Sequence, residues 1–291
     1  MDARPASRRR VVIAGAASRL QVRTGAMLRD TGIAEPILVG PWKGIEKNAL
    51  NVGADLRGME LVNASSDLDV ANVSVELVRS GQADLLVKGH IHTSALLRRV
   101  LDPLHGLRTE SRLSHVQYIY LSRTDTEFLV TDGALNISPD VRTKVDIVRN
   151  AVGLAHAIGL ASPRVALLSA TEEADSRVTS AVEAVVVKGL CQAVPLGASV
   201  FGPLAVDTAL SRSAARIKGI SNCVAGSADI LVAPNIETGN AIVKLCTHLM
   251  AGVGAGVVLG AKAPIVLTSR ADSIESRVAS VLLALSVNGL D

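Results

Sequence analysis

Short, mostly apolar runs alternate with amphipathic helical stretches along nearly the whole chain, and this alternation restricts the possible folds more than any other feature. Val11–Ala14, Ile37–Val39 and Leu85–Val87 are such runs in the first half, and Arg164–Leu168 and Ala228–Val232 are such runs in the second. Continuous apolar runs are typical of parallel strands, which are buried on both faces. Strands that alternate with helices predict a mainly parallel sheet with helices on both faces. The predicted fold class is therefore α/β.

The length of the chain predicts about two domains, because it has 291 residues and 48% of them are hydrophobic. A long helix is predicted over 141–160, between Pro139 and Pro163, and we interpret it as the connection between the two domains. A final amphipathic helix is predicted over 272–290.

The composition argues against several classes of function. The net charge is only +3, and aromatic residues make up 2% of the chain. Nucleic-acid binding needs clustered basic side chains, usually with aromatic partners for the bases, so no nucleic-acid partner is predicted. The three cysteines, Cys191, Cys223 and Cys246, have no metal-like spacing, and neither a metal site nor a disulfide is predicted.

The most membrane-like stretch, 251–267, holds five glycines or prolines and one lysine, Lys262. A membrane-spanning helix needs about 20 apolar residues without such interruptions. We interpret this stretch as a glycine turn followed by two buried strands. No segment has the pattern of a secretory signal peptide. No membrane association is expected, and the predicted location is the cytoplasm.

The loop that follows the predicted strand Leu85–Val87 carries the first group of candidate site residues. Ligands of open α/β sheets bind beyond the carboxyl ends of the strands. Free N–H groups at a helix N-terminus attract phosphate, and a basic side chain one turn along the helix can point at the same anion. An ordinary helix cap with solvated basic side chains explains the pattern equally well. The candidate substrate-binding residues here are Lys88, His92, Thr93, Ser94 and Arg98.

A second loop, Thr268–Ser273, follows the predicted strand 265–267 and combines a hydroxyl, a guanidinium and a carboxylate. Arginine binds phosphate through a planar fork of N–H groups. A capping role for Ser269 or Asp272 is the competing interpretation. The candidate catalytic residues are Ser269, Arg270 and Asp272.

Two further strand ends carry polar residues with either a binding or a structural role. Asp132-Gly133 is a turn signal after a predicted strand, and Asn136 follows in the same loop. Asn240 lies between a predicted strand and a predicted helix. Asp132, Asn136 and Asn240 complete the set of candidate substrate-binding residues.

Taken together, these four loops resemble the phosphate acetyl/butyryl transferase family over most of the chain. The most specific stretch runs from Gly260-Ala261-Lys262-Ala263-Pro264 to Thr268-Ser269-Arg270-Ala271-Asp272-Ser273, preceded by Glu237-Thr238-Gly239-Asn240. The lysine of Lys88-Gly89 and the short chain resemble the butyryltransferase branch.

The resemblance implies two α/β domains with the fold of the isocitrate and isopropylmalate dehydrogenases and an active site in the cleft between them. The expected domains are 1–138 with 263–291, and 139–262. The implied reaction transfers a short acyl group, acetyl or butyryl, between coenzyme A and phosphate in a ternary complex. The implied partners are acyl-CoA, inorganic phosphate and acyl phosphate. Coenzyme A is a substrate, no cofactor or metal is expected, and a homodimer is expected.

The resemblance also suggests roles for individual residues. Arg98 and Arg270 are expected to hold phosphate, and Ser269 to stabilise the tetrahedral transition state. Asp272 is the candidate base for the thiol of coenzyme A. In the acetyltransferase branch, the corresponding carboxylate lies at the position of Ser276, so the neighbouring Glu275 is the alternative base.

Two other functions are carried as alternatives. Phe201 stands where the family usually has an aspartate before Gly-Pro, which favours a non-catalytic paralogue that binds coenzyme A or an acyl phosphate as a sensor. The second alternative is a metal- and NAD-dependent dehydrogenase on the same fold, which needs a cluster of aspartates that the sequence does not provide.

Overall fold

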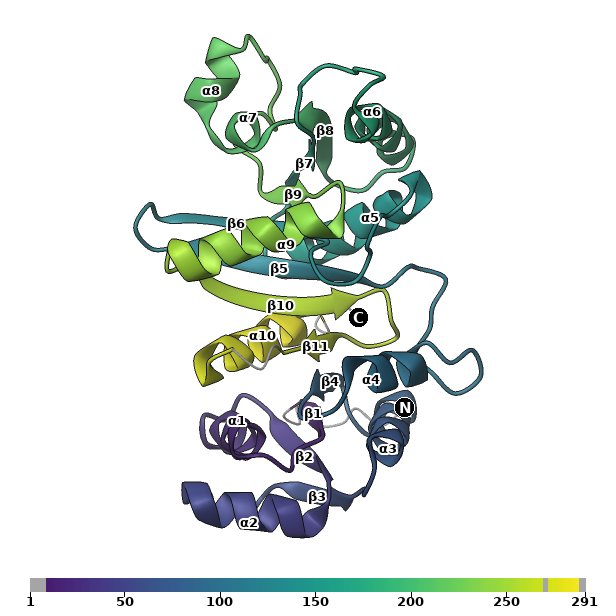
Figure 1. Ribbon diagram of the computed structural model, residues 1–291, viewed down its shortest axis with the longest axis vertical. Helices are drawn as coiled ribbons and strands as arrows, with labels where there is room; N and C mark the ends of the chain where they lie inside the picture. The colour runs from purple at the N-terminus through teal and green to yellow at the C-terminus, as the bar shows by residue number, and fades with distance from the viewer. Residues whose placement is uncertain (1–8, 269–271, 288–291) are drawn as a thin grey trace. The chain divides into compact units, whose positions relative to one another are not determined.

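The computed structural model describes residues 9–268 and 272–287, and these form two compact units (Figure 1). The first unit takes in the described residues of 1–111 and 256–289, and the second those of 112–255. The expected boundaries at 138 and 263 differ from this division. Residues 112–138 belong to the second unit, because their strands are paired there. The helix predicted over 141–160 also lies wholly in the second unit, so it does not connect the two.

The strands of the first unit run parallel except for one at the edge. Their order is β3 (Glu60–Asn63), β2 (Glu35–Gly40), β1 (Arg10–Ala14), β4 (Leu85–Lys88), β11 (Ile265–Leu267) and β10 (Val253–Leu259), which belongs to this unit from Gly256 onward. β10 is antiparallel to β11 and the others are parallel. Val11, Val12 and Ile13 in β1 are completely buried, as the continuous apolar run predicts.

Helices cover both faces of this sheet (Figure 1). α1 (Arg19–Asp30), α2 (Trp42–Val52) and α10 (Ile274–Val287) lie on one face, and α3 (Asp67–Arg79) and α4 (Thr93–Val100) lie on the other. α2 was not predicted. It buries only Ile45 and Ala49, and no side chain caps its first turn, so its sequence lacks a capping signal at the start.

The second unit begins with an antiparallel hairpin and continues with parallel strands. The order is β5 (Ser114–Leu121), β6 (Thr126–Thr131), β9 (Ile230–Val232), β7 (Arg164–Leu168) and β8 (Ser199–Leu204). α5 (Val141–Ala157) and α6 (Thr179–Gln192) pack on one face. α7 (Val206–Leu210), α8 (Arg212–Ile217) and α9 (Ile236–Lys244), followed by the π-helix η1 (Leu245–Leu249), cover a core on the other face.

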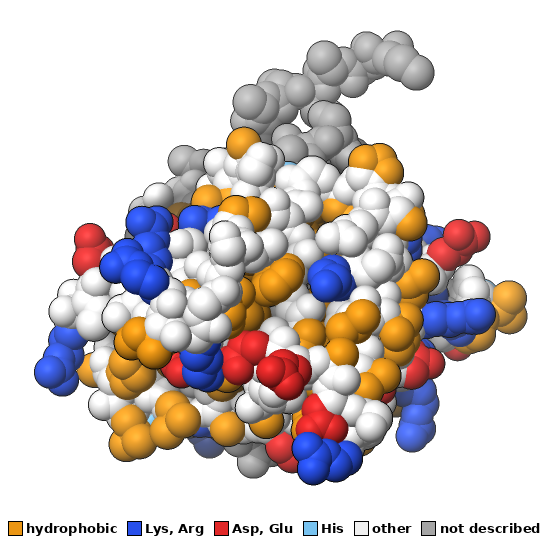
Figure 2. All heavy atoms as spheres, turned by 90° about the horizontal axis from the view of Figure 1, so that it is seen from above, with side chains coloured by type: hydrophobic (Ala, Val, Ile, Leu, Met, Phe, Trp, Pro, Cys, Tyr) orange, Lys and Arg blue, Asp and Glu red, His pale blue; other side chains and the backbone are white. Residues whose placement is uncertain are grey.

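The surface agrees with the small net charge of the sequence. On the face shown in Figure 2, Lys and Arg side chains are interspersed with Asp and Glu side chains and with apolar ones. Within the described part of the chain, no helix is both long enough and apolar enough to cross a membrane.

Candidate active site

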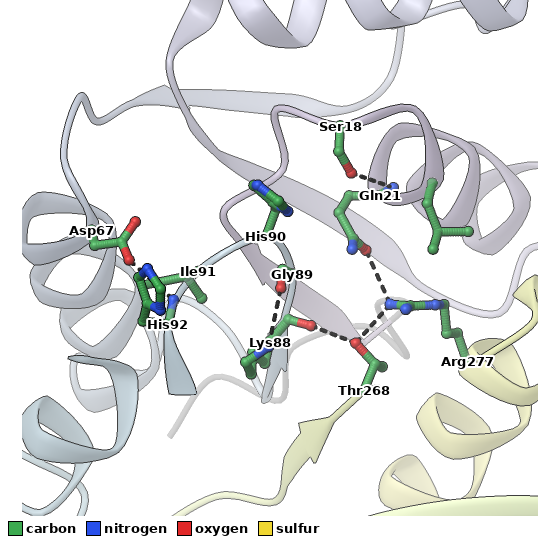
Figure 3. A pocket seen from close by; sticks show the side chains of 11 residues that line it. Ser18, Gln21, Asp67, Lys88, Gly89, His90, Ile91, His92, Thr268 and Arg277 are labelled. Carbon is green, nitrogen blue, oxygen red and sulfur yellow. Dashed lines mark hydrogen bonds between the residues drawn. The ribbon is translucent and has the colours of Figure 1, made fainter. Parts of the chain in front are cut away.

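The carboxyl ends of β1, β4 and β11 lie next to one another, because these three parallel strands are neighbours in the sheet. The loops that follow them line a pocket of about 310 Å³ (Figure 3). This is the edge at which open α/β sheets bind ligands. The lining residues are Ser18, Leu20, Gln21, Asp67, Lys88, Gly89, His90, Ile91, His92, Thr268 and Arg277.

Two glycines allow the loops after β1 and β4 to pass against each other. Gly89 N donates to Ala14 O at 2.7 Å, and His90 N donates to Gly15 O at 2.8 Å. A Cβ atom on Gly15 would lie 2.7 Å from His90 O, and a Cβ atom on Gly89 would lie 2.7 Å from Ala14 O. The close approach that Gly89 permits is therefore to the backbone of the neighbouring loop.

Arg277, on α10, is the most deeply buried charged residue of the pocket, with 2% of its surface exposed. Its Nη1 lies 2.6 Å from Thr268 Oγ1 and 3.4 Å from Gln21 Oε1 (Figure 3). Its Nε lies 3.3 Å from the carbonyl oxygen of Asp272. Thr268 Oγ1 in turn donates to Lys88 O at 2.8 Å. Burial lowers the pKa of the Arg277 guanidinium, and the negative charge of Asp272 opposes this shift.

The structure places two of the expected substrate-binding residues in this pocket. Lys88 is half-buried at the end of β4, and His92 is exposed at the start of α4. The backbone N–H of His92 donates to Asp67 Oδ2 at 3.0 Å, which fixes the loop to α3. The pocket therefore has a lysine and a buried arginine in its walls.

Thr93, Ser94 and Arg98 do not line the pocket. All three are exposed on α4, and Arg98 follows Ser94 by four residues, which puts both on one face of the helix. His92 occupies the N-cap position and makes no side-chain capping bond. The capping role considered for Thr93 and Ser94 is therefore wrong, since both lie inside the helix.

Of the three expected catalytic residues, Ser269 and Arg270 lie outside the described residues. Asp272 is half-buried, and its carbonyl oxygen is the one that Arg277 contacts. Ser273 caps α10: its hydroxyl accepts a hydrogen bond from Ser276 N at 3.2 Å. Neither Ser269 nor Asp272 is thus needed to explain the start of this helix.

Glu275, the alternative base, is exposed in the first turn of α10. Its own backbone N–H and the hydroxyl of Ser273 hold the pKa of its carboxyl below the usual value. A lower pKa makes the carboxylate a weaker proton acceptor.

In the second unit, Asp132 and Asn136 hold the loop after β6. Asp132 is 2% exposed. One carboxylate oxygen accepts from the backbone N–H groups of Ala134 and Leu135 at 2.8 and 2.9 Å. The other accepts from His115 N at 3.0 Å and from Asn136 Nδ2 at 2.7 Å. Four internal bonds occupy this carboxylate, so the structure favours the structural interpretation of Asp132.

The loop after β6 also meets the start of α9. Asn240 Nδ2 donates to Gly133 O at 3.1 Å. A Cβ atom on Gly239 would lie 2.5 Å from Asp132 O. Asp132, Asn136 and Asn240 therefore form one group, although more than a hundred residues separate Asn136 from Asn240 in the sequence.

Phe201 packs against the hydrophobic core of the second unit, and Lys188 Nζ lies 5.3 Å from the centroid of its ring. The aromatic residue is thus part of the packing of β8 against its neighbours.

Sequence analysis did not identify several residues of the pocket, notably Gln21, Thr268 and Arg277. A signal for Arg277 exists, because it shares a buried helical stripe with Val281 and Ala284, at spacings of four and three residues. A charge within such an apolar stripe indicates a special role.

Within 9–268 and 272–287, no group of three His, Cys, Asp or Glu side chains is placed to hold a metal ion.

Known proteins with related sequences are acyltransferases. The family model described as phosphate acetyl/butaryl transferase matches residues 66–285. The chain is 44% identical over 257 residues to a phosphate acetyltransferase of Rhizobium meliloti, covering 88% of this chain and 81% of the relative. It is 41% identical over 262 residues to a phosphate butyryltransferase of Clostridium acetobutylicum, covering 90% and 87%.

Solved structures confirm the expected fold class. A branched-chain phosphotransacylase from Enterococcus faecalis V583 superimposes with a TM-score of 0.86 at 34% identity, covering 97% of this chain and 99% of the other. A 4-hydroxythreonine-4-phosphate dehydrogenase from Burkholderia phymatum has a TM-score of 0.58 at 18% identity, covering 97% of each chain, and shares the fold alone. With the family model matching three quarters of the sequence and these relatives covering nearly all of it, the chain belongs to the phosphate acetyl/butyryl transferase family, whose members are acyltransferases.

Proposed function

We propose that this protein catalyses the reversible reaction of a short-chain acyl-CoA with inorganic phosphate to give acyl phosphate and coenzyme A. The observation that carries the proposal is the pocket at the ends of β1, β4 and β11, which has Lys88 and Arg277 in its walls, in a chain of this family. Both substrates are anions, so cationic side chains are needed to offset their repulsion.

In the proposed mechanism, the acyl group passes directly between the two substrates in a ternary complex. A phosphate oxygen attacks the thioester carbonyl, the carbon–sulfur bond breaks, and the thiolate of coenzyme A leaves and takes up a proton. In reverse, the thiolate attacks the carbonyl of the acyl phosphate and phosphate leaves. Coenzyme A is a substrate here, and the proposal includes no cofactor or metal.

We assign the expected residues to this mechanism as follows. Arg98 and Arg270 hold phosphate, and Ser269 donates to the carbonyl oxygen as negative charge develops there. Asp272 accepts the proton of the thiol, because it is half-buried and directly follows the segment that carries Ser269 and Arg270 in the sequence, whereas Glu275 is exposed. The residues proposed to contact the substrates are Lys88, His92, Thr93, Ser94 and Asn240, while Asp132 and Asn136 shape the loop beside Asn240.

The test is the release of coenzyme A from a panel of acyl-CoAs, from acetyl to hexanoyl, with and without phosphate. Phosphate-dependent release is expected, and the rates rank the acyl chains. The acetyl- and butyryltransferase relatives are about equally similar to this chain, so the panel decides between them. No release from folded protein that nevertheless binds coenzyme A tightly would instead support the sensor.

A homodimer and cytoplasmic residence are further parts of the proposal. Val182, Val186 and Leu190 of α6 are 40%, 46% and 44% exposed, and their spacing of four places them on one helical face. We expect this apolar stripe to form the contact between two copies. Light scattering should give a dimer for the unaltered chain and a monomer for Val186→Glu, and a monomeric mass for the unaltered chain would contradict the dimer.

A further inference from the structure

Arg277 is a charged side chain in a position where an aliphatic one would complete the packing. It shares its stripe of α10 with Val281 and Ala284 and is 2% exposed. Arginine is almost never fully buried unless it is paired, because removing its charge from water is costly. The hydrogen bonds of the Arg277 guanidinium must therefore have a role that an aliphatic side chain, which can only pack, does not fill.

Those hydrogen bonds connect three parts of the first unit. From α10, the guanidinium reaches Thr268 at the end of β11 and Gln21 in α1 (Figure 3). It also reaches the backbone carbonyl of Asp272 just before α10. The contact with Thr268 is the shortest, at 2.6 Å.

Thr268 extends the connection to β4. Its hydroxyl accepts from Arg277 Nη1 and donates to the carbonyl oxygen of Lys88 at 2.8 Å. The order of donation therefore runs from Arg277 through Thr268 to Lys88, which begins the loop Lys88–His92. An aliphatic residue at 268 could not transmit this link, because it can neither accept nor donate.

We propose that Arg277 is a positioning residue of the acyl-transfer site, which holds Thr268 and the Asp272 backbone in a fixed relation to the carboxyl end of β4. Its significance for the reaction rests on the function proposed above. Thr268 and Asp272 flank the segment that carries Ser269 and Arg270 in the sequence, Asp272 is the proposed base, and Lys88 is a proposed substrate contact.

The role requires a guanidinium. Its five N–H donors point in fixed directions within one plane, so one side chain can hold acceptors that lie on different sides of it. The ammonium group of a lysine keeps the charge but is a compact group on a flexible stem. Arg277→Lys therefore keeps the positive charge and removes the fixed donor geometry of the guanidinium, so the variant tests the geometry alone.

The experiment compares Arg277→Lys and Thr268→Val with Ser280→Ala. Ser280 is a matched control, because it is also buried on α10 and its hydroxyl bonds Ser276 O at 2.8 Å and Gly256 N at 3.0 Å, outside the pocket. Thr268→Val keeps the arginine and removes the hydroxyl that accepts from Arg277 and donates to Lys88 O, so it serves if the Arg277 variant does not fold.

The first readout is amide hydrogen exchange in the peptide spanning Lys88–His92, which needs no turnover. Exchange should be faster in both test variants and unchanged in Ser280→Ala. The second readout is kinetic: kcat and kcat/KM should fall together by about 100-fold in both test variants, since a displacement of the order of 1 Å can cost this much. The double variant should be no worse than Arg277→Lys alone, because the bond between Arg277 and Thr268 is already lost in that variant.

Two results would overturn the inference: exchange at Lys88–His92 that matches the unaltered chain, or unchanged kcat in folded Arg277→Lys and Thr268→Val. Failure of the proposed function looks different. In that case the unaltered protein releases no coenzyme A from any acyl-CoA, while hydrogen exchange still shows whether Arg277 fixes the loop.

Discussion

The side-chain amide of Asn136 lies 2.7 Å from a carboxylate oxygen of Asp132, and the same amide nitrogen donates to Leu113 O at 2.8 Å. The carboxylate is thus an acceptor on both oxygens, surrounded only by donors. This predicts the result of replacing one of the oxygens with an NH₂ group.

Asp132→Asn should lower the free energy of unfolding by about 1–3 kcal/mol, because the new NH₂ group would face donors and leave buried groups unsatisfied. Chemical denaturation measures the change. Asp140→Asn is the control, since Asp140 caps α5 by accepting from Thr143 N at 2.8 Å and asparagine caps equally well. Equal stability of Asp132→Asn and the unaltered chain would contradict the structural role of this carboxylate.

Gly239→Ala should destabilise the second unit. The added Cβ atom would lie 2.5 Å from Asp132 O and 2.9 Å from Gly133 Cα, and these backbone atoms can move only if the loop moves. A loss of about 1–3 kcal/mol is expected from such overpacking. Gly153→Ala should instead stabilise the protein by about 0.5–1 kcal/mol, because Gly153 is exposed inside α5 and nothing lies within 4 Å of its Cβ position. Thermal unfolding of the two variants should therefore shift in opposite directions.

Arg98→Ala should raise the KM for phosphate by about 10-fold or more, since a hydrogen bond to a charged group is worth about 1.5–3 kcal/mol. The KM for acyl-CoA should change less. Initial rates at varied phosphate measure the effect, and Arg57→Ala is a control because that side chain is 92% exposed in the same unit. If the KM for phosphate is the same in Arg98→Ala as in the unaltered chain, Arg98 does not bind phosphate.

Alkylation at pH 8 should modify Cys223 and leave the two buried cysteines intact. Burial raises the pKa of the Cys191 thiol to about 11 and also raises that of Cys246, so neither forms much of the reactive thiolate. Cys223 is exposed. Because the folded-state pKa of Cys191 lies above its ordinary value of 9.0, its contribution to stability is present below pH 9 and is lost as the pH rises through about 11. Peptide mapping should find no label in Cys223→Ser, and label on Cys191 in folded protein would contradict the buried position.

Much of the fold could be predicted because its strands are buried on both faces. The apolar runs around Val12, Leu38 and Leu86 have the continuous pattern of strands that are buried on both faces. α7 and α8 were not predicted, since five and six residues are too few for a helical periodicity to be recognised. α2 was not predicted either, and no side chain caps its first turn to mark its start. The expected boundary at 138 differs from the division after residue 111, because the pairing of β6 with β9 joins residues about a hundred positions apart and draws β5 and β6 into the second unit.

The sequence pointed to the residues of the pocket where they lie at the carboxyl end of a strand, as Lys88 does at the end of β4. Arg277 was not found, because it lies inside a helix and only the tertiary structure brings it to Thr268. For Asp132, the position in a strand-end loop left both a binding and a structural role open, and its four internal acceptor bonds, which only the tertiary structure shows, favour the structural one.

The crossing of the loops at Gly15 and Gly89 bears on any attempt to reshape the pocket by substitution. At this crossing the surface consists of main-chain atoms packed too tightly for even a methyl group. Substitution therefore cannot enlarge or narrow the pocket there. Its size can be changed only at the side walls, where Leu20 and Ile91 supply apolar side chains that can be exchanged for larger or smaller ones.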